Sequence, residues 1–157
     1  MSRIHDLTLL NPGRTALGEF SKAIAGELIE ETTLELARIR SSQLTGCARC
    51  LSAHWKAALA IGMPVDRIAM IDVWQEAGIF SAREQAALAW TESLTRNADT
   101  HVSDAEYDAV REHFTEEEMV ELTWAILSIN TWNRINTAFG TGQAFSFELP
   151  VEKAAAD

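Results

Sequence analysis

Helix-start signals recur along the 157 residues of this chain, while strand signals are nearly absent. In four places a Ser or Thr is followed three residues later by Glu, the pattern in which the two side chains cap a helix N-terminus reciprocally. The four pairs are Thr32 with Glu35, Ser81 with Glu84, Ser103 with Glu106 and Thr115 with Glu118. Sustained alternation of apolar and polar residues is missing, and so are Asn-Gly and Asp-Gly turns. The sequence therefore predicts an all-α protein.

Helix boundaries follow from apolar residues spaced three and four apart and from the glycines and prolines between these segments. The second predicted helix ends at Gly46 and buries Leu34, Ala37 and Leu44. The expected helices are, in chain order, 13–29 with Pro12 at its start, the one that ends at Gly46, 47–61, Pro64 to about Trp74, 81–96, 103–113, and 115–138 closed by Gly140. This pattern predicts one compact domain of six to seven short helices over 1–149, followed by a flexible tail over 150–157.

Charge and hydropathy narrow the classes of partner. The formal net charge is -10 at pH 7, which repels phosphate backbones and anionic lipid headgroups. We therefore expect neither nucleic acid nor a membrane as a partner. No stretch of about 20 apolar residues could span a membrane, and the N-terminal segment lacks the apolar region of a signal peptide. A cytoplasmic location is expected.

Cys47 and Cys50 are the two cysteines of the chain and lie three residues apart. In a reducing compartment such a pair favours redox chemistry or metal binding over a lasting structural disulfide. On a helix with about 100° per residue, Cys47, Cys50 and His54 fall within about 60° of arc on one face. Helical residues three apart have Cα atoms about 5 Å apart, which a disulfide tolerates, and residues four apart can touch. The pattern predicts a thiol pair that opens and closes beside an imidazole.

A helix start favours ionisation of a thiol, because unpaired N–H groups and the helix dipole stabilise a thiolate. This position favours Cys47 as the more acidic thiol, whereas contact with His54 favours Cys50. Which sulfur attacks a substrate first is therefore left open. Glu35 has two compatible interpretations, as a capping partner of Thr32 and as a carboxylate that orients His54.

Two other interpretations of the cysteine pair are less favoured. In the first, Cys47 and Cys50 are simply small hydrophobic residues buried in the core. In the second, they supply four ligands to a structural zinc ion together with His54 and Glu35. Zinc sites more often draw ligands from two separated clusters, and no second CxxC or HxxxH occurs here. We therefore expect neither a metal nor a cofactor. The other histidines, expected at the surface without a role, are His5, His101 and His113.

Residues 35–62, ELARIRSSQLTGCARCLSAHWKAALAIG, resemble the alkylhydroperoxidase D-like branch of the carboxymuconolactone decarboxylase superfamily. That branch has a Glu, a CxxC twelve residues later, and a His four residues after the second Cys. The matching residues here are Glu35, Cys47, Cys50 and His54. The resemblance extends over roughly 12–147, and its specific part is confined to 35–62.

Residues 130–136, NTWNRIN, look like the last core helix of the same family. The segment is rich in amides, with Asn130, Asn133 and Asn136, and it also holds Arg134. These side chains fit a pocket lining, a buried polar network or a subunit contact.

The resemblance implies an all-helical fold that assembles as homo-oligomers, either trimers or hexamers. Members with the cysteine pair are similar to antioxidant peroxidases, which reduce hydroperoxides through a dithiol–disulfide cycle. The best-known type is re-reduced by a lipoyl-bearing partner. Decarboxylase members lack the pair, so its presence argues against that chemistry. One departure is Arg49, because the founding peroxidase type has a His between its cysteines, and this difference predicts a less complete proton relay.

The expected function is therefore a peroxiredoxin-type oxidoreductase, a thiol-dependent hydroperoxide reductase with no cofactor. In this scheme His54 accepts a thiol proton and Glu35 orients the imidazole. One thiolate attacks the peroxide oxygen and becomes a sulfenic acid, and the other cysteine closes a disulfide that a dithiol donor reopens. The expected catalytic residues are Glu35, Cys47, Cys50 and His54. The alternatives are a redox-sensing or scaffold protein without peroxidase activity, and a cofactor-free decarboxylase of the same superfamily.

Overall fold

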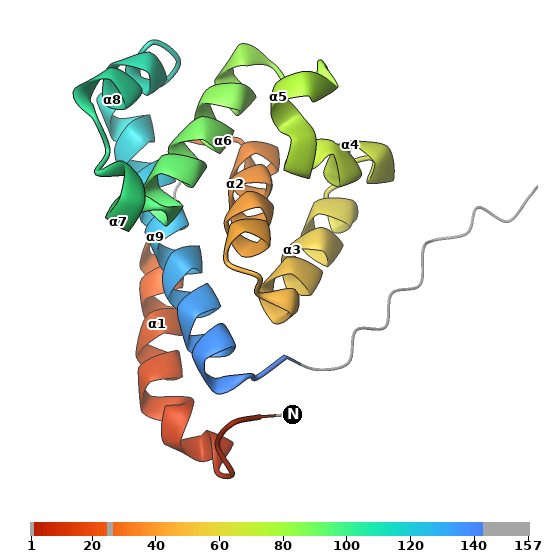
Figure 1. Cartoon of the computed structure of the whole chain (residues 1–157), viewed down its shortest axis with the longest axis vertical. Coiled ribbons are helices and arrows are strands. Elements are labelled where there is room, and N and C mark those ends of the chain that lie inside the picture. The colour runs from red at the N-terminus through yellow and green to blue at the C-terminus, as the bar shows by residue number, and fades with distance from the viewer. Residues whose placement is uncertain (1, 25–26, 143–157) are drawn as a thin grey trace, which may run out of the picture.

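The computed structural model describes residues 2–24 and 27–142, so the tail predicted over 150–157 lies outside the described residues. All regular structure in the described part is helical, which confirms the all-α prediction (Figure 1). The elements are, in chain order, η1 (Leu7–Leu10), α1 (Asn11–Ala23), α2 (Glu31–Leu44), α3 (Ala48–Ala60), α4 (Val65–Ala69), η2 (Met70–Val73), α5 (Trp74–Ala77), α6 (Ala82–Thr95), α7 (Asn97–Thr100), α8 (Asp104–Arg111) and α9 (Glu116–Phe139), where η marks a 3-10 helix. Among these helices none is long and apolar enough to cross a membrane.

The first predicted helix is shorter than expected. It was predicted over 13–29, but α1 ends at Ala23. The carboxylate of Glu121 in α9 accepts the backbone N–H groups of Leu28, at 3.2 Å, and of Ile29, at 3.1 Å. This contact satisfies backbone groups that a longer helix would have paired internally, so residues 27–30 stay outside a helix.

The helix predicted from Pro64 to about Trp74 is broken into α4, η2 and α5. Pro64 is the N-cap of α4 and so precedes its first turn. α5 ends at Gly78, whose φ of 65° is a left-handed conformation that glycine adopts without steric strain. The short α7 was not predicted. Six of the described helices have eight residues or more, which matches the expected six to seven.

Three of the four predicted capping boxes form. Ser81, Ser103 and Thr115 each accept the backbone N–H of the Glu three residues later, and that Glu accepts the N–H of the N-cap in return. The fourth box is wrong, because α2 begins one residue before Thr32 and no side chain caps it. Glu35 therefore has no capping role and is available to other partners.

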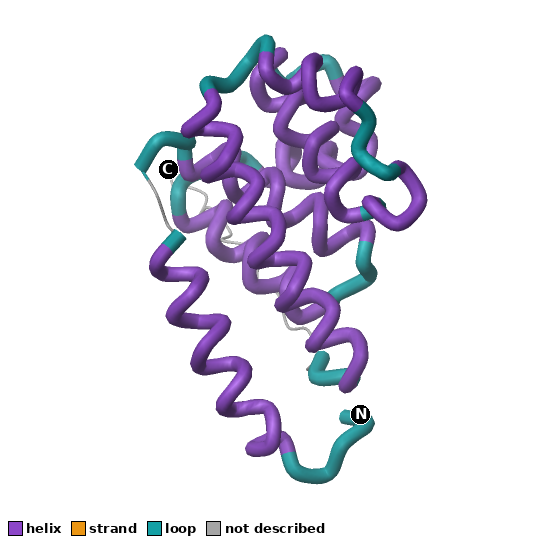
Figure 2. The backbone as a smooth tube through the Cα atoms, turned by 90° about the vertical axis from the view of Figure 1, so that its left-hand side faces the viewer, coloured by secondary structure: helices purple, strands orange, loops and turns teal. Residues whose placement is uncertain are grey.

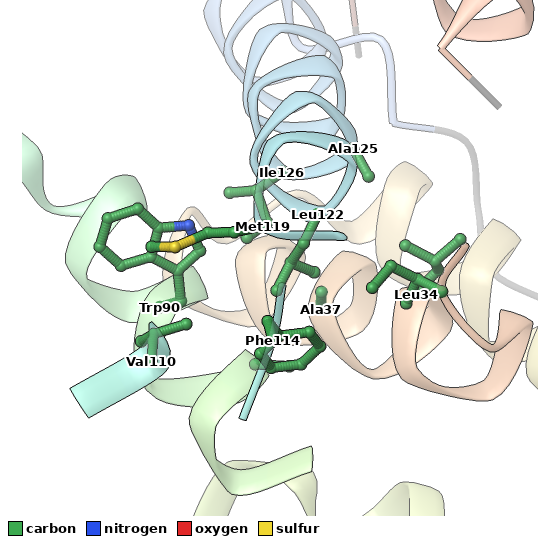
Figure 3. Packing of buried hydrophobic residues seen from close by; sticks show 11 residues of the cluster. Leu34, Ala37, Trp90, Val110, Phe114, Met119, Leu122, Ala125 and Ile126 are labelled. Atoms are coloured by element: carbon green, nitrogen blue, oxygen red, sulfur yellow. The ribbon is translucent and has the colours of Figure 1, made fainter. Parts of the chain in front are cut away.

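α2 lies at the centre of the bundle, packed against α3, α6 and α9 (Figure 1). One apolar cluster joins it to α6, α8 and α9 and includes Leu34 and Ala37, as predicted (Figure 3). A second cluster joins α2 to α3, α4, η2 and α6 and includes Leu36 and Ile39. Leu44, expected in the same stripe, is only half-buried. α2 thus buries several faces instead of one.

α1 runs antiparallel to α9 along the outside of the bundle (Figures 1 and 2). The ring of Phe20 meets that of Trp124 edge-on, with centroids 5.7 Å apart. One turn further along α9, the hydroxyl oxygens of Ser21 and Ser128 lie 2.8 Å apart. These contacts hold α1 where it forms one wall of the site described below.

The start of α2 can be tested by comparing two capping substitutions. Ser81→Ala removes the N-cap side chain of α6 and is expected to lower the free energy of unfolding by about 1 kcal/mol. Thr32→Ala has no cap to remove, because Thr32 is exposed inside α2, and is expected to stay within about 0.5 kcal/mol of wild type. Urea unfolding of both variants measures the difference, and equal losses would contradict the observed boundary.

Candidate active site

The turn between α2 and α3 brings the two cysteines together. Gly46, with a φ of 66°, reverses the chain after α2, and Cys47 follows in an extended conformation as the N-cap of α3. The predicted helix began at Cys47 itself, so the argument from helical rotation holds for Cys50 and His54 alone. Cys47 reaches the sulfur of Cys50 from the N-cap of α3 instead. Both cysteines are free, and their sulfurs lie 2.7 Å apart.

Cys47 is placed to carry negative charge. Its Sγ accepts the backbone N–H of Cys50 at 3.4 Å, one of the otherwise unpaired N–H groups of a helix start. The hydrogen bond with the Cys50 thiol lowers the pKa of Cys47 to about 7. Burial opposes this shift, while the backbone N–H groups of Cys50 and Arg49 and the Arg49 charge add to it. Arg49 was expected to make the proton relay less complete. Its charge nevertheless helps to lower the pKa of Cys47 and so favours a thiolate there.

Cys50 holds the proton that the two sulfurs share. Its pKa is raised, first by the hydrogen bond to the Cys47 sulfur and second by burial. The side-chain amide of Asn136 opposes the shift by donating to Cys50 Sγ at 3.3 Å. Cys47 and Cys50 are 2% and 5% exposed, and Ile129 and Trp132 pack around them. The electrostatics thus favour Cys47 as the more acidic thiol of a closed pair.

A buried carboxylate holds His54 in place. Nδ1 of His54 lies 2.9 Å from Glu35 Oε2, and Arg38 donates to Glu35 Oε1 at 2.5 Å. Burial raises the pKa of Glu35, but the hydrogen bonds and charges of His54 and Arg38 outweigh burial and hold that pKa below its usual range. Nε2 of His54 remains for proton exchange. Among the described hydrogen bonds none joins His54 to a sulfur of the cysteine pair.

A cavity of about 200 Å³ lies beside His54. Its walls come from α1, α2, α3 and α9, and they include Arg38. Ile129 and Trp132 belong both to this wall and to the cluster around the cysteines, so the cavity and the thiol pair share a boundary. Two further cavities, of about 360 and 470 Å³, contain none of the four predicted site residues. Of these three cavities, the one beside His54 is therefore the one that adjoins the site.

The asparagines of α9 form a buried polar row. Asn130 and Asn133 both bond to Ser41 of α2, at 3.3 and 3.0 Å, while Asn136 donates to Cys50. The described contacts fit the buried-network interpretation of these residues. The sequence pattern had not placed Asn136 at the site, although its three-residue spacing from the other asparagines was a signal that one helix face carried all of them.

The four predicted site residues form two contacting pairs. Glu35 binds His54, and Cys47 contacts Cys50. In the part of the chain that the structure describes, no three side chains of His, Cys, Asp or Glu gather where they could hold a metal ion. The zinc interpretation therefore finds no support in this geometry.

The chain belongs to the carboxymuconolactone decarboxylase family, whose family model matches residues 14–93, a range that contains all four predicted site residues. The superfamily that the resemblance predicted is thereby confirmed, and a solved structure with 29% identity, described as a candidate AhpD protein, supports the alkylhydroperoxidase D-like branch within it. The uncharacterized protein YdfG of Bacillus subtilis (strain 168) is 38% identical over 132 residues, which make up 84% of this chain and 90% of that protein.

Solved structures share the fold. A protein of unknown function from Agrobacterium tumefaciens, described as a candidate antioxidant defence protein AhpD, matches with a TM-score of 0.87 at 29% identity, over 93% of this chain and 100% of that one. An AhpD core from Ralstonia eutropha JMP134, of a peroxidase-related protein, matches with a TM-score of 0.73 at 21% identity, over 85% and 73%. The debrominase Bmp8, in complex with 2,3,4-tribromopyrrole, matches with a TM-score of 0.71 at 22% identity, over 79% and 66%. The last two show the fold alone, and this fold hosts more than one chemistry.

The Glu35–His54 contact predicts a pH-dependent contribution to stability. Because the folded-state pKa of Glu35 is lowered, its charge stabilises the fold above the ordinary pKa of 4.5, and this contribution is lost as pH falls through the lower folded-state pKa. Glu35→Gln is expected to lower the free energy of unfolding by about 3 kcal/mol at neutral pH, and the deficit should shrink in acid. Urea unfolding over this pH range measures it, with exposed Glu112→Gln as the control. A deficit that does not change with pH would contradict the assignment.

Proposed function

We propose that this protein is a thiol-dependent hydroperoxide reductase that works through a dithiol–disulfide cycle of Cys47 and Cys50 without a bound cofactor. The observation that carries this proposal is the pair of free sulfurs, 2.7 Å apart at the start of α3. From this separation a disulfide closes by small side-chain movements, so the cycle needs no refolding of the site. The relationship to the alkylhydroperoxidase D-like branch supports the same chemistry.

In the first step the thiolate of Cys47 attacks the terminal oxygen of the hydroperoxide. The O–O bond breaks, Cys47 becomes a sulfenic acid, and the alkoxide takes up a proton and leaves as an alcohol. Cys47 suits this role because a pKa of about 7 gives a large thiolate fraction at neutral pH. The helix start and Arg49 stabilise the charge that makes it reactive.

In the second step Cys50 closes the disulfide. Its thiol loses a proton, its sulfur attacks the sulfur of Cys47, and the sulfenic oxygen leaves as water. His54 accepts the thiol proton through water, while Glu35 orients the imidazole. An external dithiol then reduces the disulfide, and the family relationship points to a lipoyl-bearing protein as that partner.

The substrate enters through the cavity beside His54. A volume of about 200 Å³ suits a small organic hydroperoxide. The side chains of Ile129 and Trp132 offer apolar contact to its organic part, and they form the boundary that its peroxide group crosses to reach the sulfurs. This placement favours an alkyl substrate over a charged one.

The exposed face of α9 supports assembly into a homo-oligomer. Val120, Trp124 and Leu127 lie four and three residues apart, so they share one helix face, and they are 56%, 45% and 38% exposed. An apolar row of this kind on a helix is typical of a protein contact surface. We propose a trimer or hexamer, as in the family, working in the reducing environment of the cytoplasm.

Substitution of each cysteine should give a different defect. With one equivalent of an alkyl hydroperoxide, wild type is expected to go from two free thiols to none, at a rate that rises with pH through about 7. The Cys50→Ser protein should stop at a sulfenic acid on Cys47. The Cys47→Ser protein should react with the hydroperoxide at about one tenth of the wild-type rate or below it, because Cys50 does not lie at the N-cap of α3. Thiol titration and intact-protein mass spectrometry measure these products.

Several outcomes would contradict this scheme. A sulfenic acid on Cys50 in the Cys47→Ser protein, with none in Cys50→Ser, would reverse the two roles. Activity that survives both substitutions would favour a decarboxylase-type reaction. Oxidation that changes the size of the assembly without peroxide turnover would favour a redox-sensing protein.

The role of His54 can be tested separately from that of the thiols. His54→Gln keeps a polar side chain but removes the proton acceptor, and peroxide turnover with a dithiol donor is expected to fall about 100-fold at neutral pH. The deficit should narrow in alkaline solution, where thiols ionise without a base. His5→Gln is the control, because His5 is exposed and lies near the N-terminus, far from His54 in the sequence. Equal rates in the two variants would remove His54 from the mechanism.

A further inference from the structure

Asn136 contacts a reacting sulfur, and the cycle described above does not use it. Its Nδ2 donates to Cys50 Sγ at 3.3 Å, from α9 to α3. The oxygen of the same amide accepts Thr141 Oγ1 at 2.5 Å and Arg14 Nη2 at 3.4 Å. Because two donors hold the oxygen, the amide has one favourable orientation, and its NH₂ group faces the sulfur.

We propose that Asn136 is a catalytic residue that donates a hydrogen bond to the thiolate of Cys50 as it forms and so promotes closure of the disulfide. This inference rests on the dithiol cycle proposed above. In that cycle the Cys50 thiol gives up its proton, its electron pair forms the bond to the Cys47 sulfur, and the S–O bond of the sulfenic acid breaks to release water.

The need for such a donor arises midway through the cycle. At rest, the Cys47 thiolate accepts a hydrogen bond from the Cys50 thiol, and this contact keeps Cys50 protonated and neutral. Once Cys47 is a sulfenic acid, Cys50 must ionise although it is 5% exposed, and a buried charge without donors is strongly disfavoured. Asn136 is 6% exposed, so water competes little for its N–H group. A hydrogen bond to a charged acceptor is about twice as strong as a neutral one, so this contact strengthens when Cys50 ionises.

The other charges near Cys50 act in less direct ways. Three titratable or charged groups lie at the start of α3 or on it, namely Cys47 at the N-cap, Arg49 and His54. Behind His54 lie Glu35 and Arg38 of α2, and behind Asn136 lies Arg14 of α1. Arg49 is exposed, so solvent and salt screen its charge. Arg14 binds the amide oxygen and polarises the amide toward stronger donation. Asn136 acts directly, because its amide N–H donates to the Cys50 sulfur itself.

The pKa of Cys50 can be measured without any peroxidase activity. In a Cys47→Ser protein Cys50 is the one remaining cysteine, so the ultraviolet absorbance of the thiolate reports on this group alone. Asn136→Ala in that background is expected to raise the pKa of Cys50 by about one unit, a tenfold smaller thiolate fraction at neutral pH. Asn136→Asp, which keeps the shape but replaces the donor by a carboxylate, is expected to raise it further.

Asn133→Ala is the matched control. Asn133 lies one turn earlier on α9 and is fully buried, but it bonds to Ser41 and Ser42 and not to a sulfur. The pKa of Cys50 is expected to stay within about 0.3 units in this variant. Equal shifts in the Asn136→Ala and Asn133→Ala proteins, or no shift in either, would overturn the proposal. If Asn136→Ala does not fold by circular dichroism, Thr141→Val, which removes a donor that orients the amide, takes its place with a smaller expected rise.

With both cysteines present, Asn136→Ala should also slow disulfide closure. After one equivalent of cumene hydroperoxide, a 1,3-dicarbonyl reagent is expected to trap about tenfold more sulfenic acid than in wild type, because Cys50 ionises less readily. Unchanged trapping with an unchanged pKa would exclude the proposed role. If wild type forms neither sulfenic acid nor disulfide, the proposed function fails, while the pKa comparison still decides whether Asn136 stabilises the thiolate.

Discussion

Because α2 is packed against α3, α6 and α9, each buried polar side chain on it needs a partner inside the protein. Glu35 finds His54 on α3, Arg40 finds Glu92 on α6, and Ser41 finds two asparagines on α9. Each of these contacts joins α2 to a different neighbour. The pairing that satisfies the buried carboxylate is also the one that orients the imidazole, so the same contacts stabilise the fold and build the site.

The asymmetry between the two cysteines follows from a displacement of three residues at a helix start. Cys47 lies before the first turn, where backbone N–H groups point at its sulfur, and Cys50 lies inside the turn, where its own N–H is one of those donors. The hydrogen bond between the two sulfurs is the main cause of their opposite pKa shifts, and the backbone N–H groups at Cys47 add to the difference. The two cysteines of the CxxC motif look equivalent in the sequence, but in the structure Cys47 is the more acidic thiol and Cys50 the less acidic one.

Local signals predicted the architecture well because most of it is decided locally. Three capping boxes, the glycine stops and the helical spacing gave the long helices, and the CxxC pattern with its His gave the thiol site. Some boundary errors are local, such as the missing cap at Thr32, but two others involve partners distant in the chain. Glu121 lies 92 residues from Ile29, whose N–H it accepts, and Asn136 lies 86 residues from Cys50. No window of sequence shows that such residues meet, so the end of α1 and the role of the amide were not predicted.

The near-complete burial of both sulfurs also decides which molecules can exchange electrons with them. Thiol–disulfide exchange requires a sulfur to approach along the line of the bond that it breaks. Ile129 and Trp132 pack against the buried pair, so we expect a cysteine fixed on the surface of a bystander protein to reach these sulfurs poorly. A dithiol at the end of a slender, flexible arm is expected to reach them more easily. In the proposed cycle, burial of the pair would thus select the reductant by its shape.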